Sequence, residues 1–269
     1  MRDERRVLSE VHPCCLTIAG SDSGGNAGVQ ADLRTFHAYK LHGCTVFTAL
    51  TAQNPNGVYA INEIATDFVS AQLDSVLGTY SIAALKTGML GSAAVVEAVV
   101  DRLKAFPAIF KVVDPVMVAT SGAELAGAAT RIAMEEQLLP LATLITPNIP
   151  ETEALSGRAV ESLEDIRDAA KCLYDKFGAA VLIKGGHQMR NTGEAQDILF
   201  DGNEYLSFSL PRIENPISTH GTGCTLSAAI ASELALGRSL KEAVKGAKKY
   251  VYQSIEKSYL VGENCGVLF

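Results

Sequence analysis

Short apolar runs alternate along the chain with segments whose apolar residues recur at helical spacing. The runs at 16–19, 44–50, 82–85, 109–113, 141–145 and 181–183 predict buried strands. The segments at 27–39, 68–80, 93–103, 127–139 and 163–177 predict amphipathic helices. In the helix at 68–80, the residues expected to face the core are Phe68, Val69, Leu73, Val76 and Leu77. This alternation is typical of an α/β fold, a parallel sheet with helices on both faces.

The pattern changes after residue 184. Apolar segments at 198–200 and 205–208 flank an Asp-Gly-Asn turn and predict a hairpin, and two helices follow at 222–236 and 240–259. Residues near 45–64 suggest a small β-flap. Because no repeat or linker divides the chain, we expect a single three-layer α/β/α domain over 13–269 with a mostly parallel sheet. The charged extension at 1–12 is expected to be poorly ordered.

Composition narrows the class of protein. The net charge of −7 and the absence of a Lys/Arg-rich patch argue against a nucleic-acid partner. No stretch approaches 18 consecutive apolar residues, and no apolar leader follows the N-terminus. We therefore expect no membrane partner and no signal peptide, and we expect the protein to be cytoplasmic. The six cysteines form no C-x-x-C pair and have no His cluster beside them, so buried free thiols are favoured over zinc or disulfides.

A small-residue turn opens the helix predicted at 222–236. Gly221, Thr222 and Gly223 form that turn, and Cys224 lies in the first turn of the helix. A helix N-terminus leaves backbone N–H groups free and adds the positive end of the helix dipole, so the turn suits an anion such as a phosphoryl group. The same position is expected to stabilise a Cys224 thiolate, which is a candidate base.

Polar motifs follow several of the predicted strands. They lie at 20–25, 86–89, 114–115, 146–148 and 184–187. The carboxyl ends of parallel strands meet at one edge of a sheet, where ligands bind, so we expect these loops to converge on an active site. The glycine-rich segment at 20–28 has neither the dinucleotide nor the P-loop spacing, which argues against a Rossmann dehydrogenase.

Each polar residue of these motifs also has a simpler interpretation. Asp114, Asn148 and Glu151 could hold Mg²⁺ through waters, or Asn148 and Glu151 could only cap a helix. Lys184 could reach a phosphate, or extend into solvent from a strand end. His187 and His220 are interpreted as structural or solvated.

The joint set of motifs resembles the hydroxymethylpyrimidine/phosphomethylpyrimidine kinases of thiamine biosynthesis, over residues 15–256. The matching segments are 19–33 (AGSDSGGNAGVQADL), 51–54 (TAQN), 86–90 (KTGML), 114–117 (DPVM), 145–151 (ITPNIPE), 184–187 (KGGH) and 220–225 (HGTGCT). The resemblance implies a ribokinase-like fold that uses ATP and Mg²⁺. It also implies two transfers, first onto 4-amino-5-hydroxymethyl-2-methylpyrimidine and then onto its monophosphate. Analogy at the level of the fold suggests a homodimer.

The resemblance also implies roles for individual residues. Gln53 and Asp32 would hydrogen-bond the aminopyrimidine edge, Gly20 would approach the ring through its backbone, and Met89 would pack on the ring. The residues implied for phosphoryl transfer are Gly221, Thr222 and Gly223 as the anion hole, Cys224 where sugar-kinase relatives place an aspartate base, Lys184, Asn148 and Asp114 for ATP, and Glu151 with Asp114 for magnesium.

Three points leave alternatives open. Asn26 stands where many relatives have glycine or alanine. A pyridoxal or pyridoxine kinase of the same fold, or a protein with both activities, is one alternative. The two kinds of substrate differ at the ring edge that Gln53 would contact. A non-catalytic binding protein of this fold is the alternative of another class.

Overall fold

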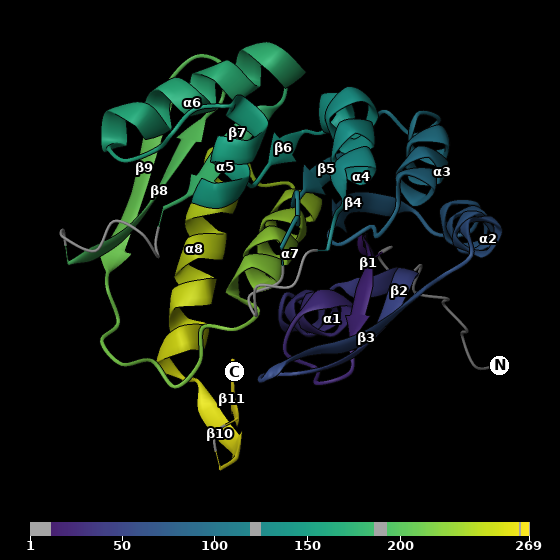
Figure 1. Cartoon of the computed structure of the whole chain (residues 1–269), viewed down its shortest axis with the longest axis horizontal. Coiled ribbons are helices and arrows are strands. Elements are labelled where there is room, and N and C mark those ends of the chain that lie inside the picture. The colour runs from purple at the N-terminus through teal and green to yellow at the C-terminus, as the bar shows by residue number, and fades with distance from the viewer. Residues whose placement is uncertain (1–11, 119–124, 186–192, 264, 269) are drawn as a thin grey trace, which may run out of the picture.

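The computed structural model describes residues 12–118, 125–185, 193–263 and 265–268. Most of the predicted extension at 1–12, and His187, lie outside the described residues. The central sheet has nine strands in the order β3-β2-β1-β4-β5-β6-β7-β8-β9 (Figure 1). Their bounds are Cys14–Asp22 (β1), His42–Asn54 (β2), Gly57–Glu63 (β3), Ile82–Thr87 (β4), Phe110–Val113 (β5), Leu144–Ile145 (β6), Ala180–Lys184 (β7), Glu194–Phe200 (β8) and Tyr205–Pro211 (β9).

The middle of the sheet is parallel and its edges are antiparallel. Strands β2, β1, β4, β5, β6 and β7 pair in parallel, whereas β3, β8 and β9 pair antiparallel to their neighbours. A separate antiparallel pair, β10 (Tyr259–Gly262) and β11 (Cys265–Val267), follows the last helix. The structure confirms the predicted α/β class with a mostly parallel sheet. The suggested flap at 45–64 is the β2–β3 hairpin, which is continuous with the sheet.

Helices cover both faces of the sheet and bury one apolar cluster on each side (Figure 1). One face carries α1 (Gly28–Ala38), α7 (Thr222–Ala235) and α8 (Leu240–Glu256). The other carries α2 (Thr66–Leu77), α3 (Ala93–Leu103), α4 (Ala128–Ala133), α5 (Ile149–Ser156) and α6 (Leu163–Phe177). Helix α7, rich in small and apolar residues, is buried along most of its length, and its N-terminus lies at the carboxyl ends of the parallel strands.

Two local expectations are wrong. Phe68 was expected to face the core, but it lies in the first turn of α2 and 60% of its surface is exposed, because Val69, Leu73 and Leu77 form the buried face. The helix expected at 127–139 is α-helical only over Ala128–Ala133. It widens into a π-helical turn at Met134–Leu138 and ends in a 3₁₀ turn that contains Pro140, which lacks a backbone N–H.

Candidate active site

A cavity of about 160 Å³ lies at the carboxyl ends of the parallel strands. The predicted site residues that line it are Gly20, Gln53, Met89, Asp114, Asn148, Glu151, Lys184, Gly221, Thr222, Gly223 and Cys224. Residues from loops far apart in the sequence therefore meet at one edge of the sheet, as the strand pattern predicts. A larger hollow of about 300 Å³ between α1 and α8 contains none of the predicted site residues.

The Gly-Thr-Gly turn lies at the N-terminus of α7. Gly221 caps the helix with φ of 84°, a left-handed conformation that favours glycine, and a Cβ atom there would collide with the carbonyl oxygen of Asn26. The helix begins at Thr222, so the N–H groups of its first turn have no partner within the helix, although the Thr222 N–H donates to the carbonyl oxygen of Thr219 at 3.4 Å. Since Gly223 and Cys224 line the cavity, their N–H groups and the positive helix end are available to an anion in it.

The glycine-rich loop after β1 is held against this turn by Asp22. The Asp22 carboxylate accepts hydrogen bonds from the backbone N–H groups of Gly24, Asn26 and Ala27 at 2.8–2.9 Å. His220 Nε2 lies 3.7 Å from Asp22 Oδ2. Burial acts to raise the pKa of Asp22, but His220 and the three N–H groups outweigh it, so the pKa is lowered. Asp22 is therefore a charged group that fixes the glycine-rich loop, with His220 of the neighbouring turn close to it.

Cys224 lies on the cavity wall in the first turn of α7. Burial raises the pKa of its thiol, while Lys86 and the backbone N–H of Gly28 act to lower it. The helix N-terminus was expected to lower the pKa of Cys224, and this expectation is wrong. Burial raises the pKa by more than the neighbouring groups lower it, because the thiolate is removed from water.

Lys184, at the end of β7, connects two carboxylates across the cavity. Its Nζ lies 2.7 Å from Asp114 Oδ1 and 3.9 Å from Glu151 Oε2. Burial disfavours the charged amine, but Asp114 and Glu151 outweigh burial and raise the pKa of Lys184. The hydroxyl of Thr146 donates to Asp114 Oδ1 at 3.2 Å. Lys184 is thus a fixed cation beside the anion turn, and the interpretation that it extends into solvent is wrong.

Asn148 and Glu151 form a reciprocal cap at the start of α5. The Glu151 N–H donates to Asn148 Oδ1 at 2.9 Å, and the Asn148 N–H donates to Glu151 Oε2 at 2.8 Å. The capping interpretation is therefore confirmed, and both residues line the cavity as well. Burial raises the pKa of Glu151 to about 7, with Lys184 opposing the shift and Asp114 adding to it.

Gln53, Met89 and Gly20 surround the opposite end of the cavity. The backbone N–H of Gln53 donates to the Ser23 hydroxyl at 2.8 Å, which fixes the end of β2 beside the glycine-rich loop. Met89 follows β4, and its Sδ would lie 3.3 Å from a Cβ at Gly20. Gly20 therefore lets the Met89 side chain pack directly against the backbone of β1 at the cavity wall.

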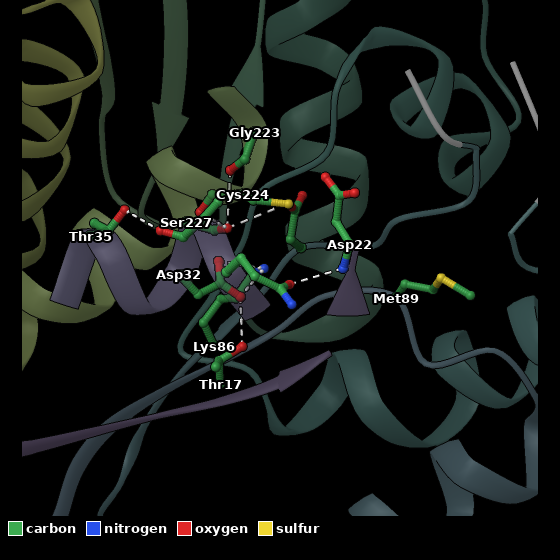
Figure 2. Close-up of polar contacts among 12 residues, drawn as sticks. Thr17, Asp22, Asp32, Thr35, Lys86, Met89, Gly223, Cys224 and Ser227 are labelled. Carbon is green, nitrogen blue, oxygen red and sulfur yellow. Dashed lines mark hydrogen bonds and ion pairs between the residues drawn. The ribbon is translucent and has the colours of Figure 1, made fainter. Parts of the chain in front are cut away.

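Asp32 does not line the cavity. It is fully buried on α1, where Thr17 Oγ1 donates to it at 2.6 Å and Lys86 Nζ lies 3.0 Å from both of its carboxylate oxygens (Figure 2). The role expected for Asp32, a hydrogen bond to the ligand, is not supported by this placement. Lys86 does line the cavity, as expected for the motif at 86–89, but the sequence assigned no role to this lysine. The signal that could have found it is a lysine in an otherwise apolar strand.

Comparison with known proteins identifies the family. The phosphomethylpyrimidine kinase family model matches residues 22–268. The chain belongs to this family. A hydroxymethylpyrimidine/phosphomethylpyrimidine kinase of Haemophilus influenzae is 45% identical over 253 residues, which cover 93% of this chain and 94% of that protein. The crystal structure of an ADP complex of Bacillus subtilis pyridoxal kinase superposes with a TM-score of 0.87 and 37% identity, over 96% of each chain.

Some members of the phosphomethylpyrimidine kinase family are parts of longer proteins. The thiamine biosynthesis bifunctional protein ThiED of Geobacter sulfurreducens is 45% identical over 93% of this chain, which spans only 51% of that relative. The superposition with the pyridoxal kinase confirms the expected ribokinase-like architecture. Among the described residues, none of the helices is long and apolar enough to cross a bilayer.

Proposed function

We propose that this chain transfers the γ-phosphoryl group of ATP to the hydroxymethyl group of 4-amino-5-hydroxymethyl-2-methylpyrimidine, and then a second one to the resulting monophosphate. The observation that carries the proposal is the anion turn at the start of α7, which faces the same cavity as Lys184 at one end and Gln53 with Met89 at the other. The family membership supports the same activity. Positioning and neutralisation of charge account for most of the catalysis in phosphoryl transfer.

The two ends of the cavity have different tasks in this proposal. At the ring end, the carboxamide of Gln53 offers a donor and an acceptor to the aminopyrimidine edge, and the Met89 side chain packs on the ring. At the phosphate end, the first-turn N–H groups of α7 bind the oxygens of the transferred group, and Lys184 balances the charge that moves with it. Lys184, Asn148 and Asp114 form the proposed ATP side.

Magnesium fits the acidic side of the cavity. Two carboxylates, Asp114 and Glu151, share one lysine, and the pKa of Glu151 is raised mainly by burial, with the nearby charge of Asp114 adding to the shift. A divalent cation would remove that excess, and Mg²⁺ in proteins is bound by few carboxylates together with waters and phosphates. We propose that Asp114 and Glu151 hold it through waters, where it would neutralise the ATP phosphates.

Cys224 has a smaller part in this proposal. Its thiol is protonated at neutral pH because its pKa is raised by burial. A phosphoryl group that is neutralised by lysine and a metal needs little help from a base. We infer that Cys224 contacts the accepting hydroxyl, and that the N–H groups around it carry more of the rate.

A second acceptor is supported by one specific observation. The superposition with the B. subtilis pyridoxal kinase covers nearly the whole chain, so the same cavity could accept a hydroxypyridine. We keep pyridoxal as the alternative acceptor. The single domain over 13–269, the homodimer and the cytoplasmic location stay predictions.

ATP consumption with Mg²⁺ against three acceptors tests the proposed function. We expect turnover with the hydroxymethylpyrimidine and with its monophosphate, and little with pyridoxal. Turnover of pyridoxal alone would assign the chain to the alternative acceptor. No turnover with any of the three would leave the binding-protein interpretation.

Replacement of Gln53 tests the ring end. Gln53→Ala is expected to raise KM for the pyrimidine by about tenfold with kcat changed far less, because the loss of one or two hydrogen bonds to a neutral ring costs about 1.4 kcal/mol. Initial rates against pyrimidine concentration at saturating ATP measure it. The matched control is Gln196→Ala, an amide on β8 whose Nε2 donates to Ser207 away from the cavity. An unchanged KM for Gln53→Ala would remove this residue from the ring pocket.

A further inference from the structure

A nearly buried ion pair joins β8 to α8 behind the phosphate end of the cavity. Lys248 Nζ donates to Asp197 Oδ2 at 2.7 Å, and both side chains are almost fully covered. Neither residue is among those that line the cavity. The cost of taking two charges out of water often equals what their attraction returns, so such a pair is weak evidence for a role in stability. The other bond that the Asp197 carboxylate makes is therefore more informative.

The second oxygen of Asp197 holds the chain at the end of β7. Oδ1 accepts a buried hydrogen bond from the backbone N–H of Gly185 at 3.1 Å. Gly185 directly follows Lys184, and Lys184 lies opposite Asp197 in the antiparallel β7–β8 ladder. The two strands come close here, because a Cβ at Gly185 would lie 2.5 Å from the carbonyl oxygen of Gln196. Asp197 therefore fixes the backbone on the C-terminal side of Lys184.

The backbone of Lys184 is also held from its other side. Its N–H donates to the carbonyl oxygen of Pro147 at 2.9 Å, and Lys184 forms a parallel bridge with Asn148. The side chain then reaches Asp114, 2.7 Å from its Nζ. A lysine side chain is a flexible four-carbon stem, so a fixed starting point limits where its ammonium can lie. The loop at 147–148 and Asp197 together provide that starting point.

We propose that Asp197, held in turn by Lys248, is a positioning residue that sets the place of Lys184 at the phosphate end of the cavity. The inference rests on the proposed function, in which Lys184 contacts the phosphates of ATP. A residue that touches no ligand can still control such a site, because a displacement of about 1 Å in a positioning group can cost about a hundredfold in rate. Without the Asp197 acceptor, the Gly185 N–H is released, the end of β7 moves, and the Lys184 ammonium moves with it.

Two double variants that differ only in the acceptor for the Gly185 N–H test the proposal. Lys248→Met with Asp197→Asn removes both charges and keeps a side-chain oxygen, whereas Lys248→Met with Asp197→Leu removes both charges and the acceptor. Neither leaves an unpaired buried charge, which is the costly way to break such a pair. Calorimetry measures binding of the non-hydrolysable ATP analogue AMP-PCP with excess Mg²⁺. We expect the leucine form to bind about fivefold more weakly than the asparagine form, the usual effect of one hydrogen bond.

The same comparison without Lys184 separates positioning from a general structural role. When Lys184→Met is added to both double variants, they are expected to bind AMP-PCP within about twofold of each other, because the group that Asp197 positions is gone. A fivefold difference that persists without Lys184 would overturn the proposal and leave the ion pair a structural role. Equal binding of the two forms while Lys184 is present would overturn it as well.

A second variant keeps the test decisive if the leucine form does not fold. Gly185→Ala leaves the ion pair intact, but its methyl group would collide with the Gln196 carbonyl oxygen and move the end of β7. It is expected to weaken AMP-PCP binding by a similar factor, and only while Lys184 is present. Unchanged binding would again overturn the proposal. Failure of the unaltered protein to bind AMP-PCP would instead contradict the proposed function, and this inference with it.

Discussion

Lys184→Met is expected to lower kcat by about a hundredfold to a thousandfold, the usual cost of one fixed charge-stabilising donor in an active site. Its ammonium lies 2.7 Å from Asp114 at the edge of the anion turn, so the methionine keeps the shape and removes the charge. Steady-state rates at saturating ATP and acceptor measure the effect. A change in KM alone would show that Lys184 binds ATP without favouring the transfer.

The same variant has a predictable effect on stability. Without Lys184, Asp114 and Glu151 face each other with no cation between them, and the loss of one partner from a buried pair costs about 3 kcal/mol. The pKa of Glu151, already raised to about 7, would rise further, so the ionised form would cost more in the folded protein. The destabilisation is therefore expected to be smaller near pH 5, where Glu151 is protonated and only the contact with Asp114 is lost, and to grow towards pH 8. Thermal unfolding at both pH values measures it, with Lys171→Met as the surface control.

Gly221→Ala is expected to lower kcat by about a hundredfold, as a displacement of about 1 Å in a positioning group does. The new methyl group would collide with the Asn26 carbonyl oxygen, so the turn and the first N–H groups of α7 must move away from the glycine-rich loop. Backbone strain adds a loss of stability of about 2 kcal/mol. Initial rates and thermal unfolding measure the two effects separately.

The opposite end of the same helix supplies the matched control. Gly237, just after α7, has φ of 80°, close to the 84° of Gly221, but a Cβ there would meet no atom within 4 Å. Gly237→Ala should cost about 1 kcal/mol of stability from its positive φ and leave kcat unchanged. If both variants lose activity equally, backbone strain alone accounts for the loss, and the contact between the two loops is unimportant.

The strand–helix alternation predicted from the sequence agrees with the structure, because apolar periodicity reports burial directly. The prediction from periodicity fails where the surrounding structure determines which residues are buried or how a helix is hydrogen-bonded. Phe68 is as apolar as a core residue, but it lies just before Val69, the first buried residue of α2, and its side chain is exposed. The helix after residue 127 matches the apolar spacing, and only the structure reveals that its hydrogen bonding widens before Pro140.

The candidate site was predictable where a motif follows a strand or opens a helix. The turn at Gly221 and the lysine at the end of β7 meet in the cavity for that reason. The ring contact that the resemblance implied for Asp32 is not supported, because this carboxylate is paired with Lys86, and the sequence gives no distance between two residues so far apart in the chain. The expected direction of the Cys224 pKa was wrong because sequence shows the helix terminus but not the depth of burial.

The packing of α7 has a consequence for biosynthesis of the protein. This helix lies across β1, β4, β5 and α1, all of which precede it in the chain, and it supplies the anion turn. A polypeptide emerging from the ribosome therefore builds its central strands long before it can cover them. During that interval one apolar side of the sheet is open to other chains, as in large proteins that fold through intermediates. Binding of nucleotide at the anion turn cannot stabilise this nascent chain, because the turn and α7 have not yet been translated.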